Sequence, residues 1–254
     1  MSFRGDEWIV WGITPPPWLS SGLTLLLTIQ APLVVTEKVK QALIAGKKAG
    51  VVFFDFTDAF GRVDRQCLLY KIAKDFGITG KLFLHVASFL TDRFARVKVN
   101  GFHGKWLESL FGTSAGTNLG PLLFIMYLHD TPKRIFPKFA DDLSSIAVHN
   151  DIQLITEELQ YAVDEMMDWS QRWGMVLNAV KTKVMLFGDS NNCDIALQMN
   201  GSKIEQVSEF KYLGVWLDSQ LNFSFLLWLP LPGLQKVLCV FYRSVYSHRR
   251  THRQ

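Results

Sequence analysis

Two adjacent aspartates, Asp141 and Asp142, lie between two short apolar segments, residues 135–140 and 143–148. Apolar runs of this length around a polar pair are typical of two strands joined by a tight turn. Carboxylates so close together repel each other, and burial of an unpartnered carboxylate is costly or shifts its pKa. The charges must therefore be solvated at a hairpin tip or neutralised by a cation, and the spacing alone leaves both alternatives open.

A third aspartate, Asp55, ends another apolar run, residues 51–54. A fold that brings strand ends together would gather Asp55 and Asp141 around Mg²⁺, which binds few hard oxygen ligands and leaves room for substrate phosphates. Two such ions activate a hydroxyl and stabilise a leaving pyrophosphate. The aspartates are therefore candidates for a metal centre.

Apolar periodicity predicts helices over residues 36–46, 68–76, 81–90, 121–128 and a long helix capped by Asn150-Asp151. The predicted strands span residues 51–54, 94–99, 135–140, 143–148, 184–187, 195–199 and 210–217. Asn-Gly turns at residues 100–101 and 200–201 are strong hairpin signals. Because hairpins are frequent and no regular β-α-β rhythm exists, the sequence predicts an α+β fold with helices packed on a mainly antiparallel sheet.

The chain divides into three parts by composition. Residues 1–35 contain Pro15, Pro16, Pro17 and Pro32, and are expected to be an irregular leader. Residues 36–222 carry the predicted helices and strands, and residues 223–254 form an apolar and then basic tail. With 48% hydrophobic and 20% charged residues, the chain is not disordered, collagen-like or of low complexity.

Charge is distributed unevenly along the chain. Residues 219–254 carry a net charge of +5, whereas residues 1–218 carry −1. A basic tail is compatible with nucleic acid, with an anionic membrane surface, or with a merely solvated terminus.

Neither a membrane span nor a disulfide framework is expected. Prolines interrupt the two apolar stretches, residues 18–35 and 223–240, and a spanning helix needs about 20 consecutive apolar residues. Cys67, Cys193 and Cys239 lie far apart, so neither disulfides nor a cysteine-built zinc site is predicted. A reducing, intracellular compartment, nuclear or cytoplasmic, is therefore expected.

Five segments occur in the order found in reverse transcriptases. Residues 139–142, Phe-Ala-Asp-Asp, resemble the [YF]-A-D-D box of that family. The other segments resemble its first catalytic strand, its template- and substrate-contacting loop and helix, the next motif and the primer-grip hairpin: residues 52–60, 112–124, 177–188 and 210–215. The details look most like the non-LTR (LINE, Jockey-type) retrotransposon branch. An ordered set is far more specific than any single box.

The resemblance implies a polymerase palm, an antiparallel sheet backed by helices, with the activity of an RNA-directed DNA polymerase. Such an enzyme adds deoxynucleoside triphosphates to the 3′-OH of a DNA primer along an RNA template, with two Mg²⁺ or Mn²⁺ ions. Asp55, Asp141 and Asp142 match the catalytic, metal-binding triad. Asp55 and Asp141 would bridge the ions, and Asp142 would support the cluster.

The resemblance also implies roles for residues around the triad. Phe60 matches the steric gate against the ribose 2′-OH, Gly116 lies in the substrate loop, and Lys181 lies in the motif that assists the departing pyrophosphate. Tyr212 and Gly214 would shape the primer grip. The residues alone leave simpler alternatives open: Phe60 could be a core side chain, and Lys181 could be a solvated turn residue.

Three departures from the family pattern predict impaired activity. Ser114-Ala115-Gly116 replaces the usual Pro-Gln-Gly, and Ala115 has no hydrogen-bonding group to contact the template–substrate pair. The fingers expected before residue 36 are only partial, and the thumb expected after residue 222 is missing or degenerate. The chain therefore resembles a fragment of a retrotransposon polymerase. Its alternatives are a non-catalytic nucleic-acid-binding remnant and an inert relic.

Overall fold

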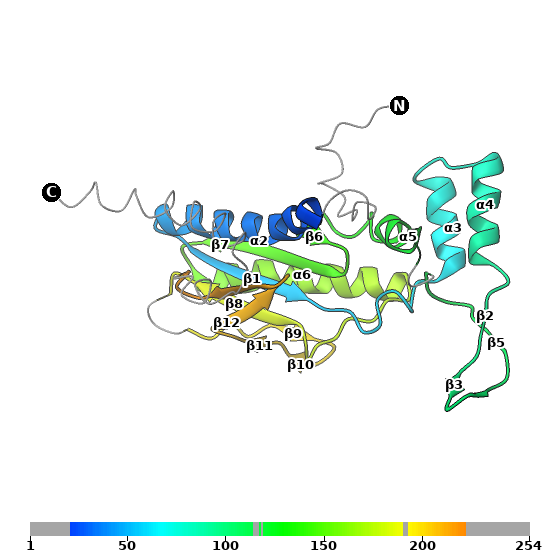
Figure 1. The fold of residues 1–254 in the computed structure, drawn as a ribbon. Helices are drawn as coiled ribbons and strands as arrows, with labels where there is room; N and C mark the ends of the chain where they lie inside the picture. The colour runs from blue at the N-terminus through cyan, green and yellow to red at the C-terminus, as the bar shows by residue number, and fades with distance from the viewer. Residues whose placement is uncertain (1–20, 114–116, 118, 190–192, 222–254) are drawn as a thin grey trace.

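The computed structural model describes residues 21–113, 117, 119–189 and 193–221. Its centre is a five-stranded sheet in the order β11-β8-β1-β7-β6 (Figure 1). These strands are β1 (Lys48–Phe54), β6 (Ile135–Phe139), β7 (Asp142–His149), β8 (Lys183–Phe187) and β11 (Glu205–Gln206). All neighbours are antiparallel except β11 and β8. The predicted α+β class with a mainly antiparallel sheet is confirmed.

Five helices and four two-stranded antiparallel pairs complete the described part of the chain. The helices are α2 (Ser21–Ile44), α3 (Arg65–Lys74), α4 (Gly80–Leu90), α5 (Leu119–Tyr127) and α6 (Ile152–Arg172). Three of the pairs are hairpins: β3 (Lys98–Val99) with β4 (Phe102–His103), β9 (Gln198–Met199) with β10 (Ser202–Lys203), and β12 (Glu209–Tyr212) with β13 (Val215–Asp218). The fourth pairs β2 (Phe94–Ala95) with β5 (Leu107–Glu108), on either side of the β3–β4 hairpin in the chain.

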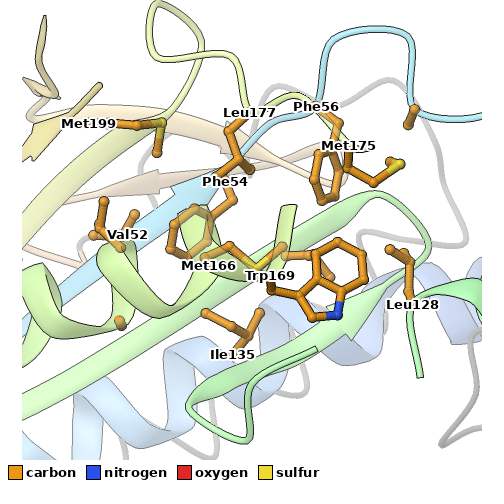
Figure 2. Close-up of a cluster of buried hydrophobic side chains, with 14 of the residues drawn as sticks. Val52, Phe54, Phe56, Leu128, Ile135, Met166, Trp169, Met175, Leu177 and Met199 are labelled. Carbon is orange, nitrogen blue, oxygen red and sulfur yellow. The ribbon is translucent and has the colours of Figure 1, made fainter. Parts of the chain in front are cut away.

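Helix α6 covers one face of the sheet, and Gly50 makes that contact close. A Cβ on Gly50 would lie 2.5 Å from Ile155 Cγ2 and 2.8 Å from Leu159 Cδ1, so no larger residue fits without repacking. Beyond Gly50, the side chains of Val52 and Phe54 join the core on this face (Figure 2). The long helix predicted after Asn150-Asp151 forms, and Asp151 caps it by accepting a hydrogen bond from Gln153 N.

The opposite face is covered by α2 and the β12–β13 hairpin. Ala49, Val51 and Phe53 alternate with the α6-facing residues, as a strand requires. Phe53 stacks on Phe210 of the hairpin with ring centroids 4.6 Å apart. The hairpin is thereby fixed over the end of β1 where Asp55 follows.

The prediction of an irregular leader is wrong for residues 21–35, because α2 begins at Ser21 and passes through Pro32. An interior proline costs about 3 kcal/mol. Helix α2, however, buries Ala31, Val35, Val39 and Ala42 against the sheet. Each fully buried valine contributes about 1.5–3 kcal/mol to stability. The packing of α2 therefore outweighs the cost of an interior proline. In the described segments, no helix is long and apolar enough to cross a membrane.

Two predicted strands are divided in the structure. Residues 94–99 form β2 and β3, and residues 210–217 form β12 and β13 around a turn at Leu213 and Gly214. Both Asn-Gly turns form hairpins as predicted. The predicted basic tail, residues 223–254, lies outside the described residues, as do residues 1–20.

Candidate active site

The β6–β7 hairpin carries two of the three candidate aspartates. Phe139 pairs with Asp142, so Ala140 and Asp141 form the tip. Ala140 has a φ of +49°, a left-handed conformation that costs a residue with a Cβ about 1–2 kcal/mol. Asp141 is exposed and Asp142 is half-buried. Backbone strain of this kind is common where a fold holds functional side chains in place.

Strand register places the third aspartate beside this hairpin. Phe54 of β1 pairs with Leu143 of β7, the last pair of this register. Asp55 directly follows Phe54 and Asp142 directly precedes Leu143, so the two aspartates continue the register by one position. Directly opposite residues of an antiparallel pair project from the same face, with Cβ atoms about 5 Å apart. By this alternation, Asp55 and Asp142 share the face on which Phe53 packs against the β12–β13 hairpin.

The segment around Asn178 holds Asp55 in position. Asp55 N donates to Thr182 Oγ1 at 3.2 Å, and Asn178 N donates to the Asp55 carbonyl at 2.8 Å. Lys181, whose side chain is 68% exposed, places its Nζ 3.8 Å from Asp55 Oδ2. The structure therefore brings Lys181 to Asp55, although the two are far apart in sequence. This ion pair is too long for a hydrogen bond.

The three carboxylates interact electrostatically. Burial, together with the negative charges of Asp141 and Asp55, raises the pKa of Asp142 to about 6. Burial also raises the pKa of Asp55, which Lys181 opposes and Asp141 reinforces. Asp55 Oδ2 is buried and accepts no hydrogen bond. The three aspartates therefore concentrate negative charge that Lys181 alone does not balance.

A divalent cation fits this donor set. Hard carboxylate oxygens are the ligands that Mg²⁺ prefers, and a cation would compensate the buried Asp55 oxygen, which accepts no hydrogen bond, and the mutual repulsion of the carboxylates. Within the described ranges, however, no three His, Cys, Asp or Glu side chains are already gathered as a closed ligand set. The three carboxylates are therefore suitable ligands for a metal ion, although their side chains are not yet arranged around one position.

Asp142→Asn is expected to stabilise the metal-free protein at pH 7 by about 1–3 kcal/mol. Because the pKa of Asp142 in the folded state, about 6, exceeds its usual value, the unfolded chain loses this proton first as pH rises. Wild-type stability therefore falls between about pH 4 and pH 6 relative to the variant. Urea unfolding in EDTA from pH 4 to 8 measures this difference, with the exposed Asp168→Asn as control. If Asp142→Asn were less stable than wild type at pH 7, the buried Asp142 carboxylate would not be destabilising, which would contradict this account.

Phe60 lies between the first aspartate and the loop before α5. Its ring stacks on Phe124 of α5 with centroids 4.3 Å apart, and it is only partly buried. Thr113 N donates to the Phe60 carbonyl at 3.0 Å, and Gly112 N donates to the Val63 carbonyl at 2.7 Å. Phe60 is therefore both a packing residue and a neighbour of the predicted substrate loop. Gly116, with Ser114 and Ala115, lies outside the described residues.

Arg65 organises the approach to this loop, which the sequence did not indicate. Its guanidinium donates to the carbonyl oxygens of Gly112 and Phe111, each at 2.8 Å, and to that of Ser109. It also donates to the Ser109 hydroxyl at 3.2 Å. Because most of these acceptors are backbone carbonyls, and none is an acidic side chain, the sequence offers no charged partner that would reveal the contact. Gly112 has a φ of +88°, which favours glycine, and a Cβ added there would lie only 3.1 Å from the Phe60 carbonyl oxygen.

The predicted primer-grip residues lie on the hairpin that covers Phe53. Tyr212 is 2% exposed, and its ring centroid lies 4.9 Å from that of Phe53. Burial raises the pKa of Tyr212, and the charge of Asp142 adds to the effect. Leu213 and Gly214 have φ of +48° and +82°, so Gly214 forms the exposed half of a tight turn. Tyr212 packs the hairpin next to the aspartates rather than facing solvent.

Comparison with known proteins places the chain in a family. The model of the family "Reverse transcriptase (RNA-dependent DNA polymerase)" matches residues 21–217. The RNA-directed DNA polymerase from mobile element jockey is 30% identical over 183 residues in Drosophila melanogaster, covering 68% of this chain and 20% of that protein. Its Drosophila funebris counterpart is 31% identical over 196 residues, covering 72% and 21%.

Similarity to solved structures is more distant. Apo telomerase from Candida tropicalis, truncated from its C-terminal domain, gives a TM-score of 0.49 at 15% identity, covering 76% of this chain and 38% of that one. The chain spans about a fifth of the length of the curated relatives it matches. The predicted resemblance is confirmed by the match over residues 21–217, and the chain belongs to the reverse transcriptase (RNA-dependent DNA polymerase) family.

Proposed function

We propose that this chain supplies the palm of an RNA-directed DNA polymerase, which adds deoxynucleotides to the 3′-OH of a DNA primer along an RNA template. The observation that carries this proposal is the strand register that sets Asp55 beside Asp142, next to Asp141 at the hairpin tip. Family membership favours the same reaction.

Three carboxylates would hold the divalent ions, Mg²⁺ or Mn²⁺. Asp55 and Asp141 would hold the ions, and Asp142, whose pKa is raised, would support the cluster. When bound, two such ions promote attack by a hydroxyl and stabilise the leaving oxygen. The half-buried position of Asp142 keeps water away from its carboxyl and strengthens its electrostatic coupling to the neighbouring charges.

Lys181 and Phe60 would act on the incoming nucleotide. The exposed ammonium of Lys181, 3.8 Å from Asp55 Oδ2, would contact the departing pyrophosphate. The Phe60 ring, fixed by its stacking on Phe124, would exclude a ribose 2′-OH by contact. Gly116 belongs to the same proposed substrate region by its place in the sequence.

The β12–β13 hairpin would position the primer end. Tyr212 anchors it against Phe53, close enough to Asp142 for their charges to interact, and Gly214 exposes backbone at the turn. The proposed roles of Tyr212 and Gly214 are therefore structural and backbone-mediated.

Primer extension on paired templates tests the proposal. Purified chain is incubated with Mg²⁺, deoxynucleotides and the same labelled DNA primer annealed to RNA or to DNA of identical sequence. Extension on the RNA template is expected, and it should disappear in Asp141→Asn/Asp142→Asn but persist in the exposed Asp168→Asn control. Folded protein that extends neither template, with Mg²⁺ or Mn²⁺, would contradict the proposal, and retained RNA binding would then favour a non-catalytic binding remnant.

A further inference from the structure

Residues 92–111 form an arm that the proposed active site does not use. The arm consists of the short β2–β5 and β3–β4 pairs, with the Asn100-Gly101 turn at its tip. Figure 1 shows it projecting from the end of α4, away from the five-stranded sheet. Its base is anchored because Arg65 donates to carbonyls of residues 109–112.

The arm exposes large apolar side chains. Phe102 is 83% exposed and Trp106 is 60% exposed. Other exposed large apolar residues of the arm are Phe94, Val97, Val99, Leu107, Leu110 and Phe111. An isolated exposed apolar side chain is ordinary, but eight on one short arm indicate an interaction surface.

Basic side chains are interleaved with these aromatic rings. Within the arm, Arg93, Arg96, Lys98 and Lys105 outnumber Asp92 and Glu108. The Arg96 guanidinium lies 4.5 Å from the centroid of the Trp106 ring, and the Arg93 guanidinium lies 5.1 Å from that of Phe89 on α4. The arm therefore presents flat π surfaces together with positive charge.

An open depression of about 580 Å³ lies on the arm and is lined by Asp92, Arg93, Phe94 and Trp106. Two aromatic rings, a guanidinium and a carboxylate together provide stacking surfaces and both hydrogen-bond donors and acceptors. These are the groups that recognise an unstacked nucleobase.

We propose that the arm binds single-stranded nucleic acid, with a base held in the Trp106 depression and phosphates contacted by Arg93 and Arg96. The excess of basic over acidic residues favours a polyanion over a protein partner. The inference rests on the proposed function in one respect, because it adds a second contact for the strand that the polymerase handles. Its test measures binding and not chemistry.

Trp106→Ala is expected to weaken binding of a short, unstructured, fluorescein-labelled RNA by about 5- to 100-fold, the usual loss for one stacked base. Fluorescence anisotropy at constant salt measures this change in Kd. Tyr161→Ala is the matched control, because Tyr161 on α6 is also exposed (53%) and carries the Arg134 guanidinium 4.8 Å from its ring centroid. Circular dichroism confirms that both variants remain folded.

Arg96→Gln gives an independent readout. Loss of one phosphate contact should lower the slope of log K against log salt by about one, while the slope of Tyr161→Ala stays at the wild-type value. Equal Kd values for Trp106→Ala, Tyr161→Ala and wild type would overturn the proposal. So would loss of concentration-dependent self-association in Trp106→Ala with RNA affinity intact, since the arm would then be a protein-binding surface.

The two proposals fail in distinguishable ways. If Asp141→Asn/Asp142→Asn abolishes extension while Trp106→Ala binds RNA normally, the arm proposal fails and the polymerase proposal stands. If Trp106→Ala weakens RNA binding but wild-type protein never extends a primer, the arm proposal stands and the polymerase proposal fails.

Discussion

Asp55→Asn is expected to lower Mg²⁺-dependent primer extension by about 10³-fold or more, since divalent ions contribute several kcal/mol to such transition states. Asparagine keeps the size of the side chain but removes the charge that would hold a cation. The free energy of unfolding in EDTA at pH 7 should not fall, because burial of the Asp55 charge is unfavourable in the folded state. Extension rates and urea unfolding measure the two quantities.

The contrast between the two measurements distinguishes a metal ligand from a structural residue. A structural aspartate would lose activity and stability together, whereas Asp55→Asn should lose only activity. Asp168→Asn, on the exposed side of α6, is the control for charge removal. Near-wild-type extension by Asp55→Asn would remove Asp55 from the proposed centre.

Asp130→Ala is expected to destabilise the protein by about 3–5 kcal/mol, the usual cost of leaving a buried charge unpaired. The Lys71 side chain is fully buried, and its Nζ donates to Asp130 Oδ1 at 2.5 Å and to the Tyr127 carbonyl at 2.6 Å. Trp169 Nε1 also donates to Asp130 Oδ1, at 2.9 Å. Without Asp130, the indole N–H loses its acceptor, and the ammonium keeps the Tyr127 carbonyl but loses its paired carboxylate. Urea unfolding at pH 7 measures the loss.

A double variant tests the same pair in the opposite direction. Lys71→Met/Asp130→Ala should recover much of the stability lost in Asp130→Ala, because a neutral side chain then fills the space between the Tyr127, Trp169 and Trp173 rings. Lys71 packs 3.7 Å from the Trp173 ring centroid, so the methionine remains among aromatic partners. A double variant no more stable than Asp130→Ala would show that packing, and not the unpaired charge, dominates.

The hairpin of aspartates could be predicted because its signals are local. Polar residues between two apolar runs specify a turn, and β6 and β7 form within one residue of the predicted bounds at each end. The proximity of Asp55 could be predicted only in outline, because it depends on the register between β1 and β7. That register follows from burial of alternate residues on two faces, which requires knowledge of the strand's partners.

Other features depend on contacts that leave no residue pattern. Helix α2 extends through Pro32 because tertiary packing outweighs a local break. Lys71 and Arg65 find partners 44 or more positions away in sequence, and many of those partners are backbone atoms. The turn at Leu213 adopts positive φ without the Asn-Gly signal that marked the other hairpins, so residues 210–217 were predicted as one strand.

The effect of Ala115 and Gly116 stays a prediction, because residues 114–116 lie outside the described part of the structure. The residues that lead into this loop are described. Gly112 and Thr113 are tied to Val63 and Phe60 by backbone hydrogen bonds, so the loop begins beside the proposed steric gate.

The most direct test of the central claim is incorporation of one deoxynucleotide onto a DNA primer annealed to RNA, under single-turnover conditions across a range of Mg²⁺ concentrations. Wild type should show a saturable dependence on Mg²⁺, and Asp141→Asn/Asp142→Asn should show no incorporation at any concentration. Equal rates in the two proteins, or folded wild type that incorporates nothing with Mg²⁺ or Mn²⁺, would contradict the account that Asp55, Asp141 and Asp142 form a catalytic metal centre.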